Sequence, residues 1–456
     1  MKSMYFANLP IGELIKKDGF DCACGKHHAV DMEYIDISPG AVSRLPRALE
    51  KLSVKKPFLV SDKNTHEAAG KAVEAILEGQ GMEFISYVFP QEGVIEPDEL
   101  PVGQLCMAFE PSCDHIIAIG SGVINDVCKV LSKATGKNYI EVCTAPSMDG
   151  ILANSSSMVV NGIKSTLYTT TPKALIADID IIKNAPALML QSGLGDMVAK
   201  YVSVFEWKLS NIITDEYYCP QVAALMRAAA DKCVEAAQGL AKREEGAVQT
   251  VTEGLILSGI AMSFAQVSRP ASGLEHYFSH MFDMFTLERG TPGSRHGVQV
   301  GIGTVLTLRL YDMIKNGAIK LSREKAMAAI NAFDEAEWER KVRKIFGKTG
   351  DAVINLESSL KKNDKKRHHK RVERTLENWQ TIEEMIHRDL PSSESIVGIL
   401  NEIGAPILPS DIGIDEELVR DAFTGSREIR DKYILTSLLW DFGLMDEMCE
   451  KLIAEL

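Results

Sequence analysis

The sequence lacks the features that mark exported, membrane-spanning or nucleic-acid-binding proteins. Its first residues, MKSMYFANLPIGELIKK, contain no apolar core of the kind that a signal peptide needs, and no uninterrupted apolar run is long enough to span a bilayer. The net charge of −13 disfavours binding to nucleic acid through phosphate neutralisation. The nine cysteines are odd in number and scattered, which indicates free thiols in a reducing compartment. We therefore expect a cytoplasmic protein with no nucleic-acid partner and no membrane span.

Between residues 31 and 150 the sequence alternates between short apolar runs and helical patterns. The apolar runs occupy residues 57–62, 83–89, 114–119 and 139–143. Helical patterns lie between them, as at 65–79 and 123–133, and a later strand pattern reads ALIADID. This alternation predicts a Rossmann-like α/β domain with a mostly parallel sheet, whose ligands bind beyond the carboxyl ends of the strands.

From residue 186 onward the patterns are helical, and no strand pattern or internal repeat is found. The periodic segments are 187–209, 218–242, 246–266, 297–316, 322–346, 371–388, 393–403, 415–424 and 427–454. The sequence therefore predicts two domains, an α/β domain over residues 1–185 and an all-α domain over residues 186–456. The basic run at 361–371 is interpreted as a solvated helix face or loop.

Two predicted strand ends carry groups that suit a nucleotide. Asp62 closes PFLVSD, where a carboxylate can accept hydrogen bonds from a ribose or cap the next helix. The glycine turn at 120–122 follows a strand and opens a helix, so its N–H groups suit a pyrophosphate. It is not a GxGxxG motif, but Asp126 and Lys129 extend it to GSGxxxDxxK. The alternative for these two is a charge in the first helical turn and an exposed lysine.

Polar residues also follow the predicted strand 139–143. Thr144 and Ser147 leave the strand, Asp149 begins a turn, and Asn161-Gly162 is a hairpin signal. Hydroxyls and a carboxylate at the mouth of a sheet suit a polar ligand. They also suit ordinary turn capping, which these residues taken alone favour slightly.

Three of the ten histidines lie close together in the sequence. His276 and His280 share one face of a helix, and His296 follows a Gly/Pro-rich loop. Catalytic metal sites typically use three protein ligands, and Asp196 is an upstream acidic candidate. The HExxH metalloprotease motif is absent, because Tyr277 follows His276. The alternative is a pair of histidines that are satisfied or face solvent.

A second cluster of potential ligands lies in FDCACGKHH: Cys22, Cys24, His27 and His28. A structural zinc site is conceivable there, although the CxC spacing is tighter than in the usual zinc-binding pairs. The alternative is a loop with free thiols that leads into the first strand.

Several motifs together resemble a known family. GSGVINDVCK, TAPSMDG, GIKST, ADIDII, SGLGD, RPASGLEHYFSH and HGVQVGIGT occur in one order. The chain resembles the sn-glycerol-1-phosphate dehydrogenases, in the superfamily of dehydroquinate synthase, glycerol dehydrogenase and iron-type alcohol dehydrogenases. CxCGxxH and the closing GAPILPSDIGI…REIRDKYILTSLLWDFG look like the bacterial branch. The resemblance implies a dehydroquinate synthase-like fold with its site in the cleft between the two domains.

The resemblance also implies roles for single residues. Asp196, His276 and His296 match the ligands of one divalent metal, zinc or nickel rather than iron. Asp149 and His280 match substrate-contacting residues, and Asp196 would serve substrate as well as metal. The residues that match cofactor contacts are Asp62, Gly120, Ser121, Gly122, Val123, Ile124, Asn125, Asp126, Thr144 and Ser147.

One position departs from the family. Four residues after Asp149 the family usually has a serine near the cofactor, whereas this chain has Ala153, and Asn154 or Ser155 would stand in. The substrate phosphate needs cationic or N–H donors, for which Lys200, Arg269 and Arg295 are candidates. Ordinary exposed charge is the favoured interpretation for each of them taken singly.

The implied reaction is the reversible, NAD- or NADP-dependent reduction of dihydroxyacetone phosphate to sn-glycerol 1-phosphate. The alternatives are a glycerol dehydrogenase, a dehydroquinate synthase-like cyclase and, outside enzymes, a regulator that binds nucleotide or metal. Long apolar helical faces are compatible with a homodimer.

Overall fold

The computed structural model describes residues 5–91, 93–161 and 163–456. The chain divides into two compact units. Unit 1 comprises Met1–Met197 and Pro220–Ser268, and unit 2 comprises Val198–Cys219 and Arg269–Leu456. The chain changes unit three times: at the end of α8 (Ala187–Val198), just before α10 (Pro220–Glu235), and between Ser268 and Arg269.

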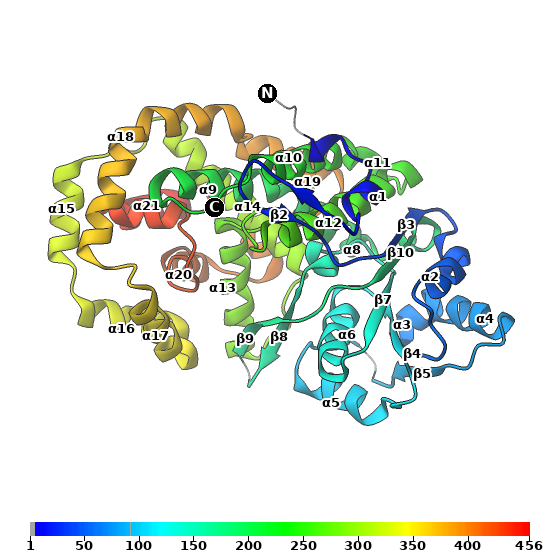
Figure 1. Ribbon diagram of the computed structural model, residues 1–456. Coiled ribbons are helices and arrows are strands. Elements are labelled where there is room, and N and C mark those ends of the chain that lie inside the picture. The colour runs from blue at the N-terminus through cyan, green and yellow to red at the C-terminus, as the bar shows by residue number, and fades with distance from the viewer. Residues whose placement is uncertain (1–4, 92, 162) are drawn as a thin grey trace. The chain divides into compact units, whose positions relative to one another are not determined.

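Unit 1 is built on a parallel sheet whose six strands follow the order β3-β10-β7-β6-β4-β5 (Figure 1). The strands are β3 (Tyr34–Ser38), β4 (Pro57–Asp62), β5 (Ile85–Phe89), β6 (His115–Gly120), β7 (Asn138–Cys143) and β10 (Ala174–Asp178). Along β6, Ile117 and Ile119 pack into one core cluster, while Ile116 and Ala118 pack into another. The two clusters lie on opposite faces, because successive side chains of a strand alternate. Burial of both faces explains why these strands read as continuous apolar runs.

Helices cover both faces of this sheet, so the predicted doubly wound α/β fold is confirmed. Residues of α2 (Leu45–Lys51) and α4 (Lys71–Gly79) join the cluster on one face, and residues of α5 (Glu99–Ala108) and α6 (Gly122–Thr135) join the other. The remaining helical segments of this unit are η1 (Phe6–Asn8), α1 (Ile11–Leu14), η2 (Ala41–Arg44), α3 (Lys63–Thr65), η3 (His66–Gly70), η4 (Asp149–Leu152), α7 (Ile179–Ile182), α11 (Ala237–Ala241) and α12 (Glu245–Ala265).

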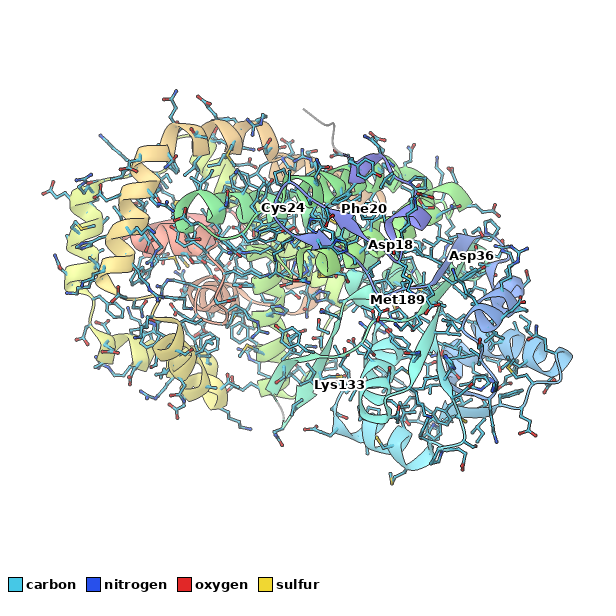
Figure 2. The ribbon with its side chains drawn as sticks, viewed as in Figure 1. Asp18, Phe20, Cys24, Asp36, Lys133 and Met189 are labelled. Carbon is cyan, nitrogen blue, oxygen red and sulfur yellow. The ribbon has the colours of Figure 1, made fainter. Side chains whose placement is uncertain are left out.

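Two antiparallel hairpins accompany the sheet. The first joins β8 (Ser155–Val160) to β9 (Ile163–Tyr168) around the predicted Asn161-Gly162 turn, of which Gly162 lies outside the described residues. The second joins β1 (Phe20–Asp21) to β2 (His27–His28), where a loop was the alternative to a metal site. Figure 2 labels Phe20 and Cys24 on this N-terminal hairpin.

One described helix, α12, is long and apolar enough to cross a membrane by length and composition alone. Its sequence is not an uninterrupted apolar run, because Glu253 lies within it. In the structure 67% of its apolar window is buried, and it packs against α10 and η4. These contacts are those of a core helix of unit 1.

Unit 2 is helical, and no strand occurs among its described residues. Its helices are α9 (Lys200–Thr214), α13 (Leu274–Arg289), α14 (His296–Lys315), α15 (Arg323–Ala332), α16 (Glu335–Phe346), α17 (Gly350–Leu360), α18 (Lys365–Asp389), α19 (Ser393–Glu402), α20 (Glu416–Ser426), α21 (Leu435–Asp441) and α22 (Met445–Ile453), with 3-10 turns η5 (Gly347–Thr349) and η6 (Pro409–Ile412). The predicted segment 322–346 is two helices, because Asp334 caps α16 by accepting from the backbone N–H groups of Ala336 and Glu337.

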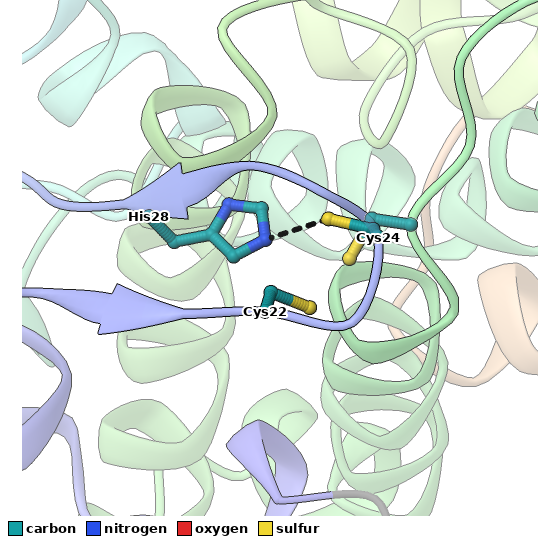
Figure 3. A group of neighbouring side chains, drawn as sticks. Cys22, Cys24 and His28 are labelled. Carbon is teal, nitrogen blue, oxygen red and sulfur yellow. Dashed lines mark hydrogen bonds between the residues drawn. The ribbon is translucent and has the colours of Figure 1, made fainter.

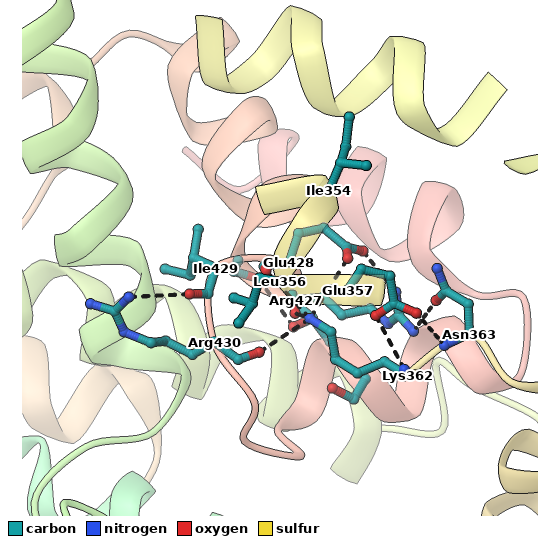
Figure 4. Close-up of polar contacts among 12 residues, drawn as sticks. Ile354, Leu356, Glu357, Lys362, Asn363, Arg427, Glu428, Ile429 and Arg430 are labelled. Carbon is teal, nitrogen blue, oxygen red and sulfur yellow. Dashed lines mark hydrogen bonds and ion pairs between the residues drawn. The ribbon is translucent and has the colours of Figure 1, made fainter. Parts of the chain in front are cut away.

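A buried ionic network orders the segment after α20 (Figure 4). Lys362 donates to the backbone carbonyls of Arg427 and Arg430, at 2.7 and 3.1 Å. Arg427 pairs with Glu428 at 2.7 Å and donates to Asn363. Burial lowers the pKa of Lys362, although nearby carboxylates oppose that shift. The network fixes the chain just before Lys432, which donates to the carbonyl of Ser272 ahead of α13.

Candidate active site

The glycine turn lies where it was predicted, between the end of β6 and the start of α6. A Cβ on Gly120 would come within 2.5 Å of Ile124, so the turn needs glycine there. Ser121 precedes the helix in an extended conformation, and its Oγ lies 2.6 Å from the Oγ of Ser147. The first N–H groups of α6 and its positive dipole end suit a phosphate group.

The polar residues that follow this turn are buried and hold the next loop. Asn125 donates to the carbonyl of Ile151 and accepts from the hydroxyl of Tyr139. Asp126 accepts from the backbone N–H of Ser157, and Lys129 donates to the carbonyl of Gly150 and, at 3.1 Å, to that of Ser155.

The alternative of an exposed lysine is therefore wrong for Lys129, which is fully buried. Burial lowers its pKa, and the charge of Asp126 opposes the shift. The GSGxxxDxxK pattern positions the segment that carries Asp149, in addition to forming the glycine turn that opens α6.

Asp62 is the N-cap of α3. Its carboxylate accepts from the N–H of Thr65 at 2.8 Å, and the Thr65 hydroxyl accepts from the N–H of Asp62 at 3.0 Å. Asp62 therefore caps the helix, which is the role that was weighed against ribose binding. The two roles are compatible, because a carboxylate has two oxygens.

Thr144 continues the hydrogen bonding of the sheet by donating its N–H to the carbonyl of Gly120.

Asp149 and Asp196 are both buried and lie together in unit 1. The N–H of Asp149 donates to Asp196 Oδ2 at 2.9 Å, and Ser258 of α12 donates to Asp149 Oδ2 at 2.7 Å. Gly193, one turn before Asp196 on α8, approaches Pro146 so closely that a Cβ would lie 2.0 Å from its carbonyl oxygen. This close approach brings the aspartate helix against the loop that carries Asp149.

The three predicted histidines lie together in unit 2. His276 and His280 are on α13, and His296 begins α14. The ring centroids of His276 and His296 are 5.3 Å apart, whereas the His280 ring lies 6.5 and 6.4 Å from these two. The two helices approach closely because Gly303 faces the carbonyl of Glu275, which a Cβ would reach at 2.3 Å.

Both imidazoles of the closer pair have their Nδ1 atoms engaged within the protein. His276 Nδ1 lies 2.9 Å from Glu275 Oε1, and His296 Nδ1 lies 3.4 Å from the hydroxyl of Ser279. Such contacts select the tautomer and orientation of an imidazole that binds metal through Nε2. One ligand atom each of Asp196, His276 and His296 lies within 4.8 Å of the other two. The donor set of one carboxylate and two imidazoles suits a divalent transition metal.

Two buried carboxylates near α13 were not found from the sequence. Burial raises the pKa of Glu275 to about 7. Burial, with repulsion from Glu275, raises the pKa of Glu206 to about 8. Glu206 accepts from the N–H groups of Leu274 and Leu435 and from the hydroxyl of Tyr311. The sequence gives no signal for Glu206, which lies within an ordinary helical pattern. The one signal for Glu275 is that it directly precedes His276.

The cationic candidates for the substrate phosphate have different environments. Arg269 is buried and pairs with Glu216, and Lys200 is buried and donates to the carbonyl of Ala271 at 3.2 Å. The alternative of exposed charge is wrong for both. Arg295 is half-buried and directly precedes His296. Ala153, which occupies the position of the absent serine, is buried. Of the two residues that would stand in for the serine, Ser155 is half-buried and Asn154 is exposed.

Comparison with known proteins gives a consistent set of relatives. Residues 36–186 match the family model described as iron-containing alcohol dehydrogenase. The chain is 30% identical over 423 residues to a glycerol-1-phosphate dehydrogenase (NAD(P)+) of Halalkalibacterium halodurans, which covers 92% of this chain and 95% of the relative. It is 32% identical to the enzyme of the same name from Methanosarcina acetivorans, over 60% of this chain and 75% of the relative.

Solved structures support the fold. A probable glycerol dehydrogenase from Sinorhizobium meliloti superposes with a TM-score of 0.60 at 14% identity, over 93% of this chain and 98% of that one. Glycerol dehydrogenase from Schizosaccharomyces pombe gives 0.59 at 14% identity, over 94% and 93%. At this identity the likeness concerns the fold alone.

Proposed function

The chain belongs to the glycerol-1-phosphate dehydrogenase family, and on that premise we propose that it catalyses the reversible, NAD(P)-dependent reduction of dihydroxyacetone phosphate to sn-glycerol 1-phosphate. The observation that carries the proposal is the grouping of Asp196, His276 and His296, whose ligand atoms lie within 4.8 Å of one another. We assign these three residues to one divalent metal, zinc or nickel. We also assign nucleotide binding to residues 1–185, which in addition supply Asp149 to the substrate, and metal and substrate binding to residues 186–456.

When bound, the metal supplies a Lewis acid for the ketone oxygen, and the nicotinamide supplies the hydride. The protein orients the ligands. Glu275 accepts a hydrogen bond from Nδ1–H of His276, so the lone pair of Nε2 is available to the metal. The N–H of Asp149 holds one oxygen of Asp196. Three protein ligands leave an open position for substrate.

Asp149 and His280 are assigned to the substrate. Ser258 holds Asp149 Oδ2, which orients the carboxylate to accept a hydrogen bond from a substrate hydroxyl. His280 lies one turn beyond His276 on α13, so it can hold or move a proton at the substrate oxygen through a ring nitrogen. For the substrate phosphate we favour Arg295, because Arg269 already pairs with a carboxylate.

The start of α6 is assigned to the nucleotide pyrophosphate, and Asp62 to the ribose. The amide N–H groups after Ser121 supply donors without a charged side chain, as in other dinucleotide sites. NAD and NADP are both kept in the proposal. A cytoplasmic location and a homodimer complete it.

Substrate class is tested by following NADH and NADPH oxidation with dihydroxyacetone phosphate or dihydroxyacetone, and NAD+ reduction with glycerol. The proposal expects turnover with the phosphate ester and little with the two unphosphorylated compounds, dihydroxyacetone and glycerol. Activity on glycerol without activity on the phosphate ester would assign the chain to glycerol dehydrogenase chemistry. Consumption of a sugar phosphate with no net change in NADH would favour a cyclase.

A further inference from the structure

The N-terminal hairpin carries a second group of potential metal ligands. Cys22 and Cys24 lie between β1 and β2, and His28 ends β2. Cys219 directly precedes Pro220, the first residue of α10. One ligand atom from each of the three cysteines and His28 lies within 4.8 Å of the others. The proposed reaction uses none of the four.

The turn of the hairpin is closed by its own backbone. The N–H of Gly25 donates to the carbonyl of Cys22 at 3.0 Å, and the N–H of Cys22 donates to the carbonyl of Lys26 at 3.1 Å. Gly25 has a φ of +86°, which a side chain at this position would disfavour. This turn places the sulfur of Cys24 opposite the ring of His28, as Figure 3 shows. The glycine of CxCG is thus needed for the turn that brings Cys24 to His28.

The ring of His28 is oriented by a hydrogen bond at Nδ1, as is usual for imidazoles that bind a metal through Nε2. The side chain is fully buried, and its Nδ1 donates to the carbonyl of Phe264 at 2.7 Å. Its Nε2 consequently faces Cys24 Sγ at 3.3 Å. The rings of Phe6 and Phe264 both lie 5.5 Å from the His28 ring and exclude water from one side. A backbone carbonyl on Nδ1 fixes the tautomer that offers Nε2 to a metal.

His27, which the sequence grouped with these ligands, belongs elsewhere. It is exposed and pairs with Asp21 across the hairpin at 2.9 Å. Cys219 takes its place. The packing of α10 against η1 and α12 explains how a cysteine so far along the chain reaches the hairpin.

The spacing of the ligand atoms suits zinc. In a tetrahedral site with Zn–S of about 2.3 Å and Zn–N of about 2.0 Å, ligand atoms lie about 3.5–3.8 Å apart. The Cys24–His28 separation of 3.3 Å and the upper limit of 4.8 Å for the group bracket this range. Three sulfurs and one imidazole are a donor set that selects zinc over oxygen-preferring cations.

We propose that Cys22, Cys24, His28 and Cys219 bind one structural zinc ion. Binding replaces the three thiol protons, which pass to solvent, and the S–H contact of Cys24 with His28 gives way to two bonds to the ion. Four protein ligands leave no open position, so the site is structural. The ion ties the N-terminal hairpin to the start of α10.

Cobalt substitution tests this site separately from the carboxylate–histidine group. The reduced protein is stripped of metal and titrated with Co²⁺, and the near-ultraviolet thiolate-to-cobalt charge-transfer band is recorded. Oxygen and nitrogen ligands give no such band. We expect the band in the wild type, in His296→Ala and in Cys106→Ser, whose exposed cysteine on α5 serves as the control. We expect its loss or clear weakening in Cys219→Ser and Cys24→Ser.

Zinc content is measured on the same proteins after purification under reducing conditions. The proposal expects one zinc per chain that remains in His296→Ala and leaves in Cys219→Ser. If the cysteine variants fail to fold, the His296→Ala protein still decides, because its Co²⁺ spectrum reports the thiols alone. Absence of the charge-transfer band in reduced His296→Ala would overturn the proposal, whether or not the protein reduces dihydroxyacetone phosphate.

Discussion

Two groups of potential metal ligands differ in what they offer a metal. The carboxylate site is Asp196, His276 and His296, and the thiol site is Cys22, Cys24, His28 and Cys219. The carboxylate site has three hard or intermediate ligands, which would leave a bound metal with an open position. The thiol site has four ligands, three of them soft, and is complete without substrate. Ligand number and type are thus the grounds on which we propose a catalytic metal for the carboxylate site and a structural ion for the thiol site.

The hydrogen-bond partners of the histidines sharpen the comparison. His276 is held by Glu275, a carboxylate whose charge raises the basicity of the imidazole. His28 is held by the neutral carbonyl of Phe264. A carboxylate partner suits a metal whose electrophilicity is tuned during catalysis, and a backbone partner suits an ion that stays in place.

The largest predicted effect comes from removing a ligand of the carboxylate site. His296→Ala should lose that metal and lower kcat/KM for dihydroxyacetone phosphate by roughly a thousandfold, because metal polarisation of a carbonyl contributes several kcal/mol. Elemental analysis and NADH oxidation measure the two effects. The matched control is His387→Ala, a change on the exposed surface of α18. If the metal content of His296→Ala is unchanged, His296 is not a ligand of this metal.

A smaller loss is expected when substrate contact is removed but the metal stays. His280→Ala should lower kcat by about 10²–10⁴-fold, the usual range for a lost proton donor or acceptor, with full metal content. Steady-state kinetics over a range of pH, together with elemental analysis, separate this outcome from ligand loss. If metal leaves with His280, that histidine belongs to the carboxylate site itself.

The partner of His276 should matter less than the ligands. Glu275→Gln keeps a hydrogen-bond acceptor for Nδ1 but removes its charge, so metal affinity should fall about 10–100-fold. Activity should recover as metal is added. Activity titrations with Zn²⁺ or Ni²⁺ measure the shift, and an unchanged midpoint would show that the charge of Glu275 does not tune the site.

The smallest effect concerns pH and stability. Burial raises the pKa of Glu206 to about 8 from 4.5, so the folded state keeps a proton that the unfolded state has released between these values. The free energy of unfolding should therefore fall as pH rises through this window. Glu206→Gln should flatten that slope in urea unfolding followed at several pH values. An equally steep slope in the variant would assign the dependence to other groups.

Much of the fold could be predicted because it follows from local patterns. β4 is an apolar run that ends in polar residues, and β7 is apolar apart from its first residue and the buried Glu141, because both faces of these strands are buried. The strands β1 and β3 were not predicted, because β1 has only two residues and the sequence of β3, YIDIS, is interrupted by Asp36. The split of 322–346 required recognising Asp334 as a cap.

The candidate sites show a similar limit. Asp196, His276 and His296 were proposed together through family resemblance, whereas spacing alone left the histidines open. Cys219 could not be joined to the hairpin cysteines, because only tertiary packing brings it there. Exposed charge was an alternative for Lys129 and for Arg269, yet each is buried and contacts polar partners that lie far away in the sequence.

Metal-dependent reduction of dihydroxyacetone phosphate tests the central claim most directly. NADH and NADPH oxidation is followed with the protein as purified, after removal of metal by chelation, and after addition of Zn²⁺ or Ni²⁺. We predict loss of turnover on chelation and its return with at least one of the two metals. Full turnover of the metal-stripped protein would contradict the assignment of Asp196, His276 and His296 to a catalytic metal.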